Sequence, residues 1–135
     1  MTYDELKENF DFLTDWEDKY AYIIELGKSL PPMDDADKND DTKVDGCMSQ
    51  VWLKTGFHDG VLTFVADSDA FIVKGLIAVL QTILSGKTPE QIVATDVDAA
   101  FAGLGLDTHL SPTRRNGFFS MVAKVKDRAT TLSTR

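Results

Sequence analysis

Residues 44–66, VDGCMSQVWLKTGFHDGVLTFVA, carry the pattern that decides the fold. β-Favouring residues run from Val51 to Thr55 and again from Val61 to Ala66. Between these runs, His58-Asp59-Gly60 has the composition of a tight turn. Because side chains alternate along a strand, the second run places three apolar residues on one face, namely Leu62, Phe64 and Ala66. The stretch therefore predicts a β-hairpin with one face available for a core.

The only cysteine of the chain, Cys47, stands just before this hairpin. Gly46 precedes it, and apolar strand character resumes only at Val51, so we expect the cysteine on a loop that leads into the first strand. Val44 can begin a short strand ahead of that loop. A lone cysteine is more often an inert apolar residue of a core. The small and polar flanking residues favour an accessible thiol instead, and both interpretations stay open at this point.

Two helices are expected ahead of the cysteine. Capping-box spacings at Thr2–Glu5 and Thr14–Glu17 each open a segment whose apolar residues recur at helical intervals. Leu30-Pro31-Pro32 ends the second segment, because the residue before a proline avoids helical dihedral angles. Residues 33–42 then form an acidic connector, which we expect to be a solvated loop. We predict no metal site there, since the connector lacks the central glycine and closing glutamate of a calcium loop.

Helical patterns return after the hairpin. Residues 70–85 are apolar nearly all round, which predicts a buried central helix capped by Ser68 or Asp69. Thr88-Pro89-Glu90-Gln91 combines an N-cap, a first-turn proline and a capping-box partner, and so predicts a further helix. Ser111-Pro112 opens the last helix, whose inner face comprises Phe118, Met121, Val122 and Val125. The order of helices, strands and helices indicates an α+β fold.

Composition bounds the classes of function. The chain has 135 residues, 43% hydrophobic content and a net charge of −8, which predicts one globular domain over residues 1–135. Its acidity argues against binding to nucleic acid, which requires a basic surface. The longest apolar run, residues 70–84, contains Lys74 and is too short to cross a membrane, and the acidic N-terminus is unlike a signal peptide. One cysteine forms no internal disulfide, so we expect a cytoplasmic protein without a membrane contact.

Two adjacent arginines, Arg114 and Arg115, fall in the first turn of the last predicted helix. The helix dipole disfavours positive charge at that end, so neither arginine is placed there to stabilise the helix. Arginines in this position more commonly pair with nearby carboxylates, and otherwise they serve a site. The sequence leaves these two interpretations open.

Four groups of residues follow one another in an order that is specific when taken together. They are Asp15-Trp16-Glu17-Asp18-Lys19-Tyr20 with residues 23–27, residues 44–53, Asp67-Ser68-Asp69-Ala70 with residues 72–78, and Leu110-Ser111-Pro112-Thr113-Arg114. Together they resemble the SufE family, sulfur acceptor proteins that work with cysteine desulfurases in iron–sulfur cluster assembly. The resemblance runs from near the N-terminus to roughly Lys126. The acidic connector at residues 34–41 and the tail after Lys126 depart from the family pattern.

The resemblance implies a small antiparallel sheet packed against helices, a SufE/IscU-like fold. It implies that Cys47 accepts persulfide sulfur from a pyridoxal-phosphate cysteine desulfurase of the SufS type, and that Arg114 stabilises the thiolate or persulfide. The chain would stimulate the desulfurase and pass sulfur to an iron–sulfur scaffold, as a carrier without a cofactor and not as an enzyme. The surface that binds the desulfurase is expected to include Gly46, Met48, Ser49, Gln50, Asp67 and Asp69, with residues 67–69 in a turn.

Three other classes of protein compete with this interpretation. An iron–sulfur scaffold or a zinc protein needs several ligands, and Cys47 with His58 and His109 is not a convincing set. A thiol hydrolase needs a histidine beside its cysteine, whereas His58 falls in the predicted turn and His109 before the last helix. The third class is a plain binding module in which Cys47 is inert. Transfer of labelled sulfur from a desulfurase separates all of these.

Overall fold

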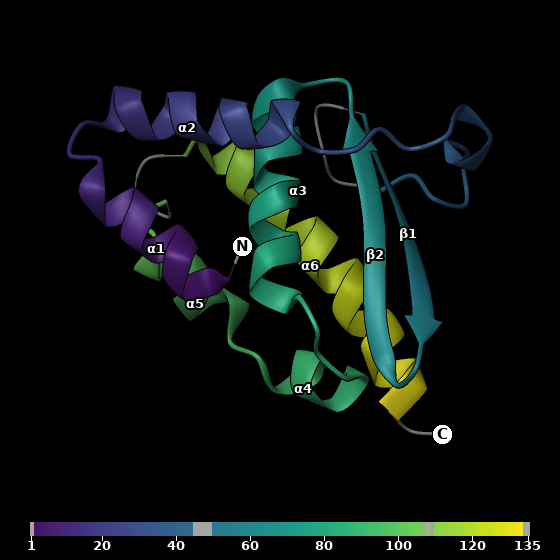
Figure 1. Ribbon diagram of the computed structural model, residues 1–135. Coiled ribbons are helices and arrows are strands. Elements are labelled where there is room, and N and C mark those ends of the chain that lie inside the picture. Colours follow the sequence, from purple (N-terminus) through teal and green to yellow (C-terminus); the bar gives the residue numbers. More distant parts are fainter. Residues whose placement is uncertain (1, 45–49, 107, 109, 134–135) are drawn as a thin grey trace.

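The computed structural model describes residues 2–44, 50–106, 108 and 110–133, and these form an α+β fold, as predicted. A hairpin stands at one side of a group of helices, and α3 lies between the hairpin and the α1–α2 pair (Figure 1). None of the described helices is both long and apolar enough to span a bilayer. In chain order the elements are α1 (Tyr3–Phe12), α2 (Trp16–Lys28), a short 3-10 helix η1 (Asp35–Asp37), β1 (Val51–His58), β2 (Val61–Ser68), α3 (Phe71–Leu84), α4 (Pro89–Ala94), α5 (Val97–Gly103) and α6 (Pro112–Ser133).

The hairpin has the predicted turn and the predicted apolar face. β1 and β2 pair antiparallel from Val51 opposite Ser68 to His58 opposite Val61. Asp59 and Gly60 connect them with φ angles of 53° and 79°, the positive values that a two-residue hairpin turn requires. β1 is longer than predicted, because this tight turn keeps its residues in register up to the turn itself. β2 is longer at its other end, where it continues through Asp67 and Ser68. The face toward the core buries Leu53, Leu62, Phe64 and Ala66.

A short third segment pairs with the start of β1. The Val44 N–H donates to the Val51 carbonyl at 2.8 Å, and the Leu53 N–H donates to the Thr42 carbonyl at 2.8 Å. Lys43 forms an antiparallel bridge with Trp52, so the strand expected near Val44 amounts to a single bridge. We call residues 41–44 the N-terminal stem and residues 50–53 the C-terminal stem, because residues 45–49 connect them. The pairing brings the two stems side by side.

The predicted buried central helix is confirmed. α3 contacts α1, α2, α6 and β2. Its buried residues are Ile72, Gly75, Leu76, Ile77, Val79, Leu80, Ile83 and Leu84. α2 crosses α3 at unusually close range through glycines on both helices: a Cβ on Gly75 would collide with the Ile23 carbonyl, and a Cβ on Gly27 with the Phe71 carbonyl. The backbones can approach this closely only because neither glycine carries a side chain.

Two of the predicted helix starts follow their capping residues. Thr2 caps α1 by accepting the Glu5 N–H at 3.2 Å, and Thr88 with Gln91 forms the capping box of α4, both as predicted. The prediction of a capping box at Thr14 is wrong, because α2 has Asp15 at its N-cap. The Asp15 side chain makes no capping hydrogen bond. Sequence spacing alone therefore predicts this helix start one residue too early.

The predicted cap of α3 is also wrong. The N-cap position is Ala70, and Ser68 Oγ, two residues before it, accepts the Ala70 N–H at 3.2 Å. The reason is that β2 continues through Asp67 and Ser68, for which the sequence predicts a turn. The chain therefore leaves the sheet and enters the helix within Asp69 and Ala70, and the side chains that could cap α3 are used in other contacts.

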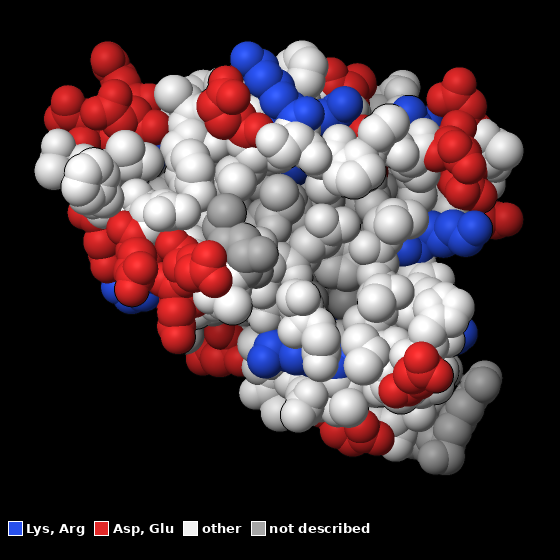
Figure 2. Space-filling view, in the orientation of Figure 1, with Lys and Arg blue, Asp and Glu red and all other residues white. Residues whose placement is uncertain are grey.

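Acidic residues are distributed unevenly over the molecule. The first 18 residues contain seven of the 22 acidic residues but only one of the 14 basic residues, so this stretch carries a net charge of −6 out of −8. It comprises α1 and the start of α2, and acidic atoms gather over this end of the molecule (Figure 2). The remaining residues are close to electrically neutral overall.

Candidate functional site

The predicted sulfur acceptor, Cys47, lies outside the described residues, as do Gly46, Met48 and Ser49. Their placement on a loop stays a prediction. The structure does describe the two stems from which this segment departs, ending at Val44 and beginning again at Gln50. Val44 is buried, whereas Gln50 is exposed. The site can therefore be built from the contacts that hold the two stems.

Asp69 holds the C-terminal stem through two hydrogen bonds to Gln50. The Gln50 N–H donates to Asp69 Oδ1 at 3.1 Å, and the Asp69 N–H donates back to the Gln50 carbonyl at 3.3 Å. The pairing of Gln50 with Asp69 thus continues the β1–β2 ladder by one step beyond Val51 and Ser68. Sequence reasoning assigned Gln50 and Asp69 to one surface, and both are exposed residues in direct contact with each other.

The N-terminal stem is held by a lysine that sequence reasoning missed. Lys124, in the middle of α6, directs its ammonium at three successive carbonyl oxygens, those of Asp41 at 3.3 Å, Thr42 at 3.1 Å and Lys43 at 3.4 Å. A lysine on a half-exposed helix face gives no sequence signal for such a contact. The two partners are about eighty positions apart in the chain, so only the tertiary fold brings them together.

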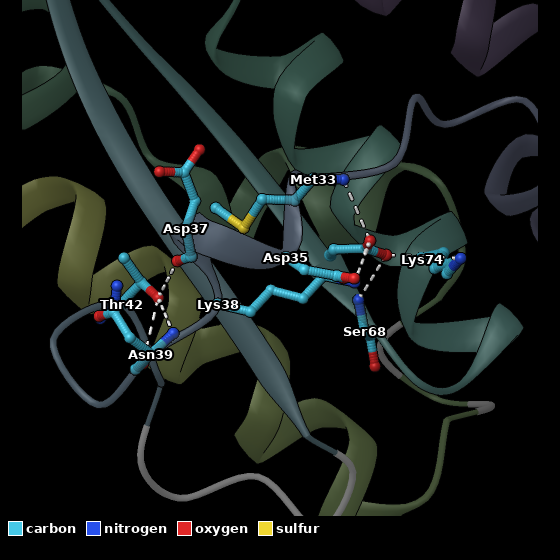
Figure 3. Close-up of polar contacts among 9 residues, drawn as sticks. Met33, Asp35, Asp37, Lys38, Asn39, Thr42, Ser68 and Lys74 are labelled. Carbon is cyan, nitrogen blue, oxygen red and sulfur yellow. Dashed lines mark hydrogen bonds and ion pairs between the residues drawn. The ribbon is translucent and has the colours of Figure 1, made fainter.

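Asp67 is buried, and this corrects the expectation that it belongs to an exposed partner-binding surface. Only 2% of the residue is exposed. Its carboxylate accepts the Met33 N–H at 3.1 Å and the Ser68 N–H at 2.8 Å. It also forms ion pairs with Lys38 at 3.2 Å and Lys74 at 3.4 Å (Figure 3). A buried carboxylate with these partners holds the connector onto the sheet and α3, and it cannot touch a docking protein directly.

The acidic connector is mostly exposed, as expected for a solvated loop, and specific hydrogen bonds hold it in place. Its first residue, Met33, is buried and is held by Asp67. Further along, Thr42 Oγ1 donates to the Asp37 carbonyl at 2.6 Å, and Asn39 Oδ1 accepts the Asp41 N–H at 2.9 Å (Figure 3). These bonds fold residues 37–42 into a compact turn that leads into the N-terminal stem. Among the described residues, no three histidine, cysteine, aspartate or glutamate side chains form a metal-binding group.

The pKa of Asp67 lies below its ordinary value. Burial by itself would raise this pKa, but the hydrogen bonds from Met33 and Ser68 and the charges of Lys38 and Lys74 together outweigh it. The side-chain hydrogen bond from Lys38 to Asp67 in turn raises the pKa of Lys38. Because the folded-state pKa of Asp67 is lowered, the ionised carboxylate stabilises the fold above its ordinary pKa of 3.8. That stabilisation is lost as the pH falls through the lowered folded-state value.

We therefore expect Asp67→Asn to lower the free energy of unfolding at pH 7 by on the order of 3 kcal/mol, because it leaves two lysines without their buried partner. The variant should also lose the part of the acid-side decline that titration of Asp67 causes. Urea unfolding at pH 7 and at steps down to pH 3 measures both effects. Asp69→Asn is the control, since the amide keeps an oxygen for Gln50 at an exposed position. Equal stability of wild type and Asp67→Asn at pH 7 would contradict this account.

Arg114 lies exposed in the first turn of α6, as expected from the sequence. Its N–H donates to Ser111 Oγ at 3.3 Å, which makes Ser111 a cap for the helix. The guanidinium carbon lies 6.0 Å from the centre of the Tyr20 ring on α2, at the outer limit of a cation–π contact. Within the described part of the chain, no carboxylate forms an ion pair with Arg114. The neighbouring Arg115 is half-buried, so the two arginines differ in environment.

Comparisons with known proteins agree with the resemblance seen in the sequence. The family model for SufE, described as an Fe–S metabolism associated domain, matches residues 4–129. An uncharacterized SufE-like protein of Rhizobium meliloti (strain 1021) is 45% identical over 130 residues, with 93% of each chain covered. A second uncharacterized SufE-like protein, from Rhizobium etli, is 42% identical over 130 residues, with 93% of this chain and 88% of the relative covered.

A solved structure shows that the fold itself is shared. The solution structure of a hypothetical protein from Thermus thermophilus matches over the whole length of both chains with a TM-score of 0.78. Its sequence identity is 18%, so the likeness concerns the fold alone. The family match over residues 4–129 and the two SufE-like relatives carry the assignment further. The chain belongs to the SufE family, whose members take part in the sulfur-transfer steps of Fe–S metabolism.

Proposed function

We propose that this chain accepts persulfide sulfur from a pyridoxal-phosphate cysteine desulfurase onto Cys47. The Cys47 thiolate attacks the terminal sulfur of the desulfurase persulfide, and a new S–S bond forms on Cys47. The S–S bond of the desulfurase breaks at the same time, and its cysteine leaves as a thiolate. The sulfur atom keeps its oxidation state, so the transfer needs no external oxidant or reductant. Only the thiolate form of Cys47 is the nucleophile.

The single observation that carries this proposal is the SufE family match over residues 4–129, a range that contains the only cysteine of the chain. A sulfur-transfer protein without a bound cofactor needs one nucleophilic thiol, and Cys47 is the sole candidate. The two stems support the proposal, because they fix the chain on both sides of residues 45–49 by backbone pairing. We propose that the recipient of the sulfur is an iron–sulfur scaffold, and that the chain acts as a carrier in the cytoplasm.

Labelled sulfur tests the proposal directly. The desulfurase of the SufS type from the same organism, supplied with cysteine that carries radioactive sulfur, should transfer label to this chain. The label should be released by a thiol reductant, because a persulfide is reducible. Addition of the chain should also raise the turnover of the desulfurase, since sulfur removal frees its active cysteine. A chain that gains no label and leaves turnover unchanged would contradict the proposal.

The desulfurase-binding surface is proposed around the C-terminal stem. Gln50 and Asp69 are exposed, and Gly46, Met48 and Ser49 belong to the adjoining segment. Asp67 is buried and accepts the N–H of Ser68, next to Asp69. We expect Asp69→Lys to change the concentration of the chain that gives half-maximal stimulation by about tenfold, because it reverses a charge at the proposed interface. Asp69→Asn, which retains the bond to Gln50, separates the effect of charge from that of the stem. Stimulation assays that give the same concentration for Asp69→Lys and wild type would remove Asp69 from the interface.

We further propose that Arg114 favours the anionic form of Cys47. A guanidinium near a thiolate lowers the thiol pKa, so Arg114→Ala should move the midpoint of Cys47 alkylation upward by roughly one pH unit. The rate of sulfur acceptance at neutral pH should fall accordingly, with little change in melting temperature. Arg128→Ala, also an exposed arginine of α6, is the control, because Arg115 is half-buried. An alkylation profile that does not shift in Arg114→Ala would contradict a role of this arginine in the ionisation of Cys47.

A further inference from the structure

One side chain outside the family motifs holds the N-terminal stem. The Lys124 ammonium lies within 3.4 Å of the carbonyl oxygens of Asp41, Thr42 and Lys43. An ammonium has three N–H donors and no acceptor, so three carbonyls use its full bonding capacity. The middle carbonyl, that of Thr42, also accepts the Leu53 N–H at 2.8 Å. Lys124 thus connects α6 to the residues that pair with β1.

This contact is not a general feature of lysines on α6. A helix-interior lysine usually extends its ammonium into water, because fixing four rotatable bonds costs conformational entropy. Lys126, two residues later, donates to the Thr95 carbonyl at 2.7 Å. Thr95 is the C-cap of α4, where a cation that bonds the last carbonyls is a common arrangement. Lys124 instead donates to the carbonyls of a turn. A hydrogen bond from the Lys43 N–H to the Asn39 carbonyl, at 3.0 Å, closes this turn.

We infer that Lys124 is a positioning residue for the sulfur-acceptor segment. It holds residues 41–43 beside β1, as Asp69 holds Gln50 on the other side, so the two ends of residues 45–49 keep a fixed separation. The effect of this role on sulfur transfer rests on the proposed sulfur-carrier function. Its structural part, the anchoring of the stem, rests only on the contacts of Lys124.

The surroundings of Lys124 make the inference testable without unfolding the protein. The side chain borders a groove of about 420 Å³ between the stem, β1 and α6, lined by Thr42, Leu53, Thr55, Asp127 and Arg128 among others. Because the groove is open to solvent, water can reach the three carbonyls when the ammonium is removed. Lys124→Met keeps a long apolar side chain and deletes only the charged donors. The stem should then loosen locally while the core stays folded.

Amide hydrogen exchange measures the stem directly. The N–H groups of Val44 and Leu53 are bonded across the stem pairing, to Val51 and Thr42. In Lys124→Met both amides should exchange about tenfold faster, as expected for loss of charge-assisted hydrogen bonds. Lys126→Met is the matched control, with the same substitution on the same helix, and should leave both rates unchanged. Lys124→Arg should restore most of the protection, because a guanidinium also donates to carbonyls.

Desulfurase stimulation then tests the positioning role. If only the ordered stem docks, Lys124→Met should raise the half-saturating concentration of the chain by the factor by which the ordered fraction of the stem, taken from the exchange rates, falls, with a maximal rate within about twofold of wild type. Unchanged exchange of Val44 and Leu53 would overturn the inference, and so would a half-saturating concentration that does not follow the ordered fraction. A wild-type chain that fails to stimulate the desulfurase would contradict the proposed function instead. The exchange rates would then decide the inference alone, since they do not depend on sulfur chemistry.

Discussion

Cys47→Ser should abolish sulfur acceptance while the protein remains folded. A serine hydroxyl is almost the same size as a thiol, but it is hardly ionised at neutral pH and forms no persulfide. We expect labelled sulfur on the variant to fall to background, at least about a hundredfold below wild type, because the nucleophile of the reaction is missing. Stimulation of desulfurase turnover should disappear with it. Circular dichroism and urea unfolding should match the wild type within about 0.5 kcal/mol, as for a substitution away from the core.

This result distinguishes the carrier from its alternatives. A Cys47→Ser protein that still gains labelled sulfur would remove Cys47 as the acceptor. A protein that unfolds would restore the interpretation of Cys47 as a core residue. Because the chain contains no second cysteine, no other thiol can take over the reaction and mask the effect.

Gly75→Ala should produce the largest loss of stability among single substitutions of a small residue. The added Cβ would collide with the backbone carbonyl of Ile23, and a backbone atom cannot rotate away as a side chain can. α2 must therefore move off α3, which disturbs the buried packing around Ile23. We expect a loss on the order of 3 kcal/mol in the free energy of unfolding and a melting temperature lower by roughly 10 °C.

Gly56→Ala is the matched control for this effect. Gly56 lies in β1, where a Cβ would meet its nearest neighbours, side-chain atoms of His58 and Thr63, at 3.4 Å, an ordinary contact distance. Removing a strand-interior glycine should then be neutral or mildly stabilising. Thermal unfolding of both variants measures the difference. If the two alanine variants melted at the same temperature, the close crossing of α2 and α3 would not be a constraint on stability.

The sequence alone predicts those parts of the fold that depend on local patterns. The Asp59-Gly60 turn and the alternation of Leu62, Phe64 and Ala66 are read within a few residues, and both are confirmed. The apolar stretch of α3 is recognised in the same way. Errors arise where a tertiary contact decides a boundary. β2 extends through Asp67 because a buried carboxylate finds partners there, and this shifts the start of α3 to Ala70.

The candidate site is predictable only in part for the same reason. Gln50 and Asp69 lie in stretches that resemble the family, and the structure brings them into contact. Lys124 and Lys38 carry no local signal, because their partners are distant in sequence and are selected by the packing of α6 and the connector. The distant partners of Asp67 likewise come from two separate segments, the connector and α3. Motifs identify the residues of a site, whereas these supporting contacts require coordinates.

The charge distribution of Figure 2 also gives the molecule an electric dipole. Its negative pole is the end formed by α1 and the start of α2, which carries most of the net charge, and the hairpin lies away from that pole. In the field of an approaching macromolecule the protein is turned before any contact forms. A strongly basic surface therefore attracts the α1–α2 end more strongly than the end with the two stems, although the connector at that second end is also acidic. Raising the ionic strength shortens the reach of this field and weakens its orienting effect.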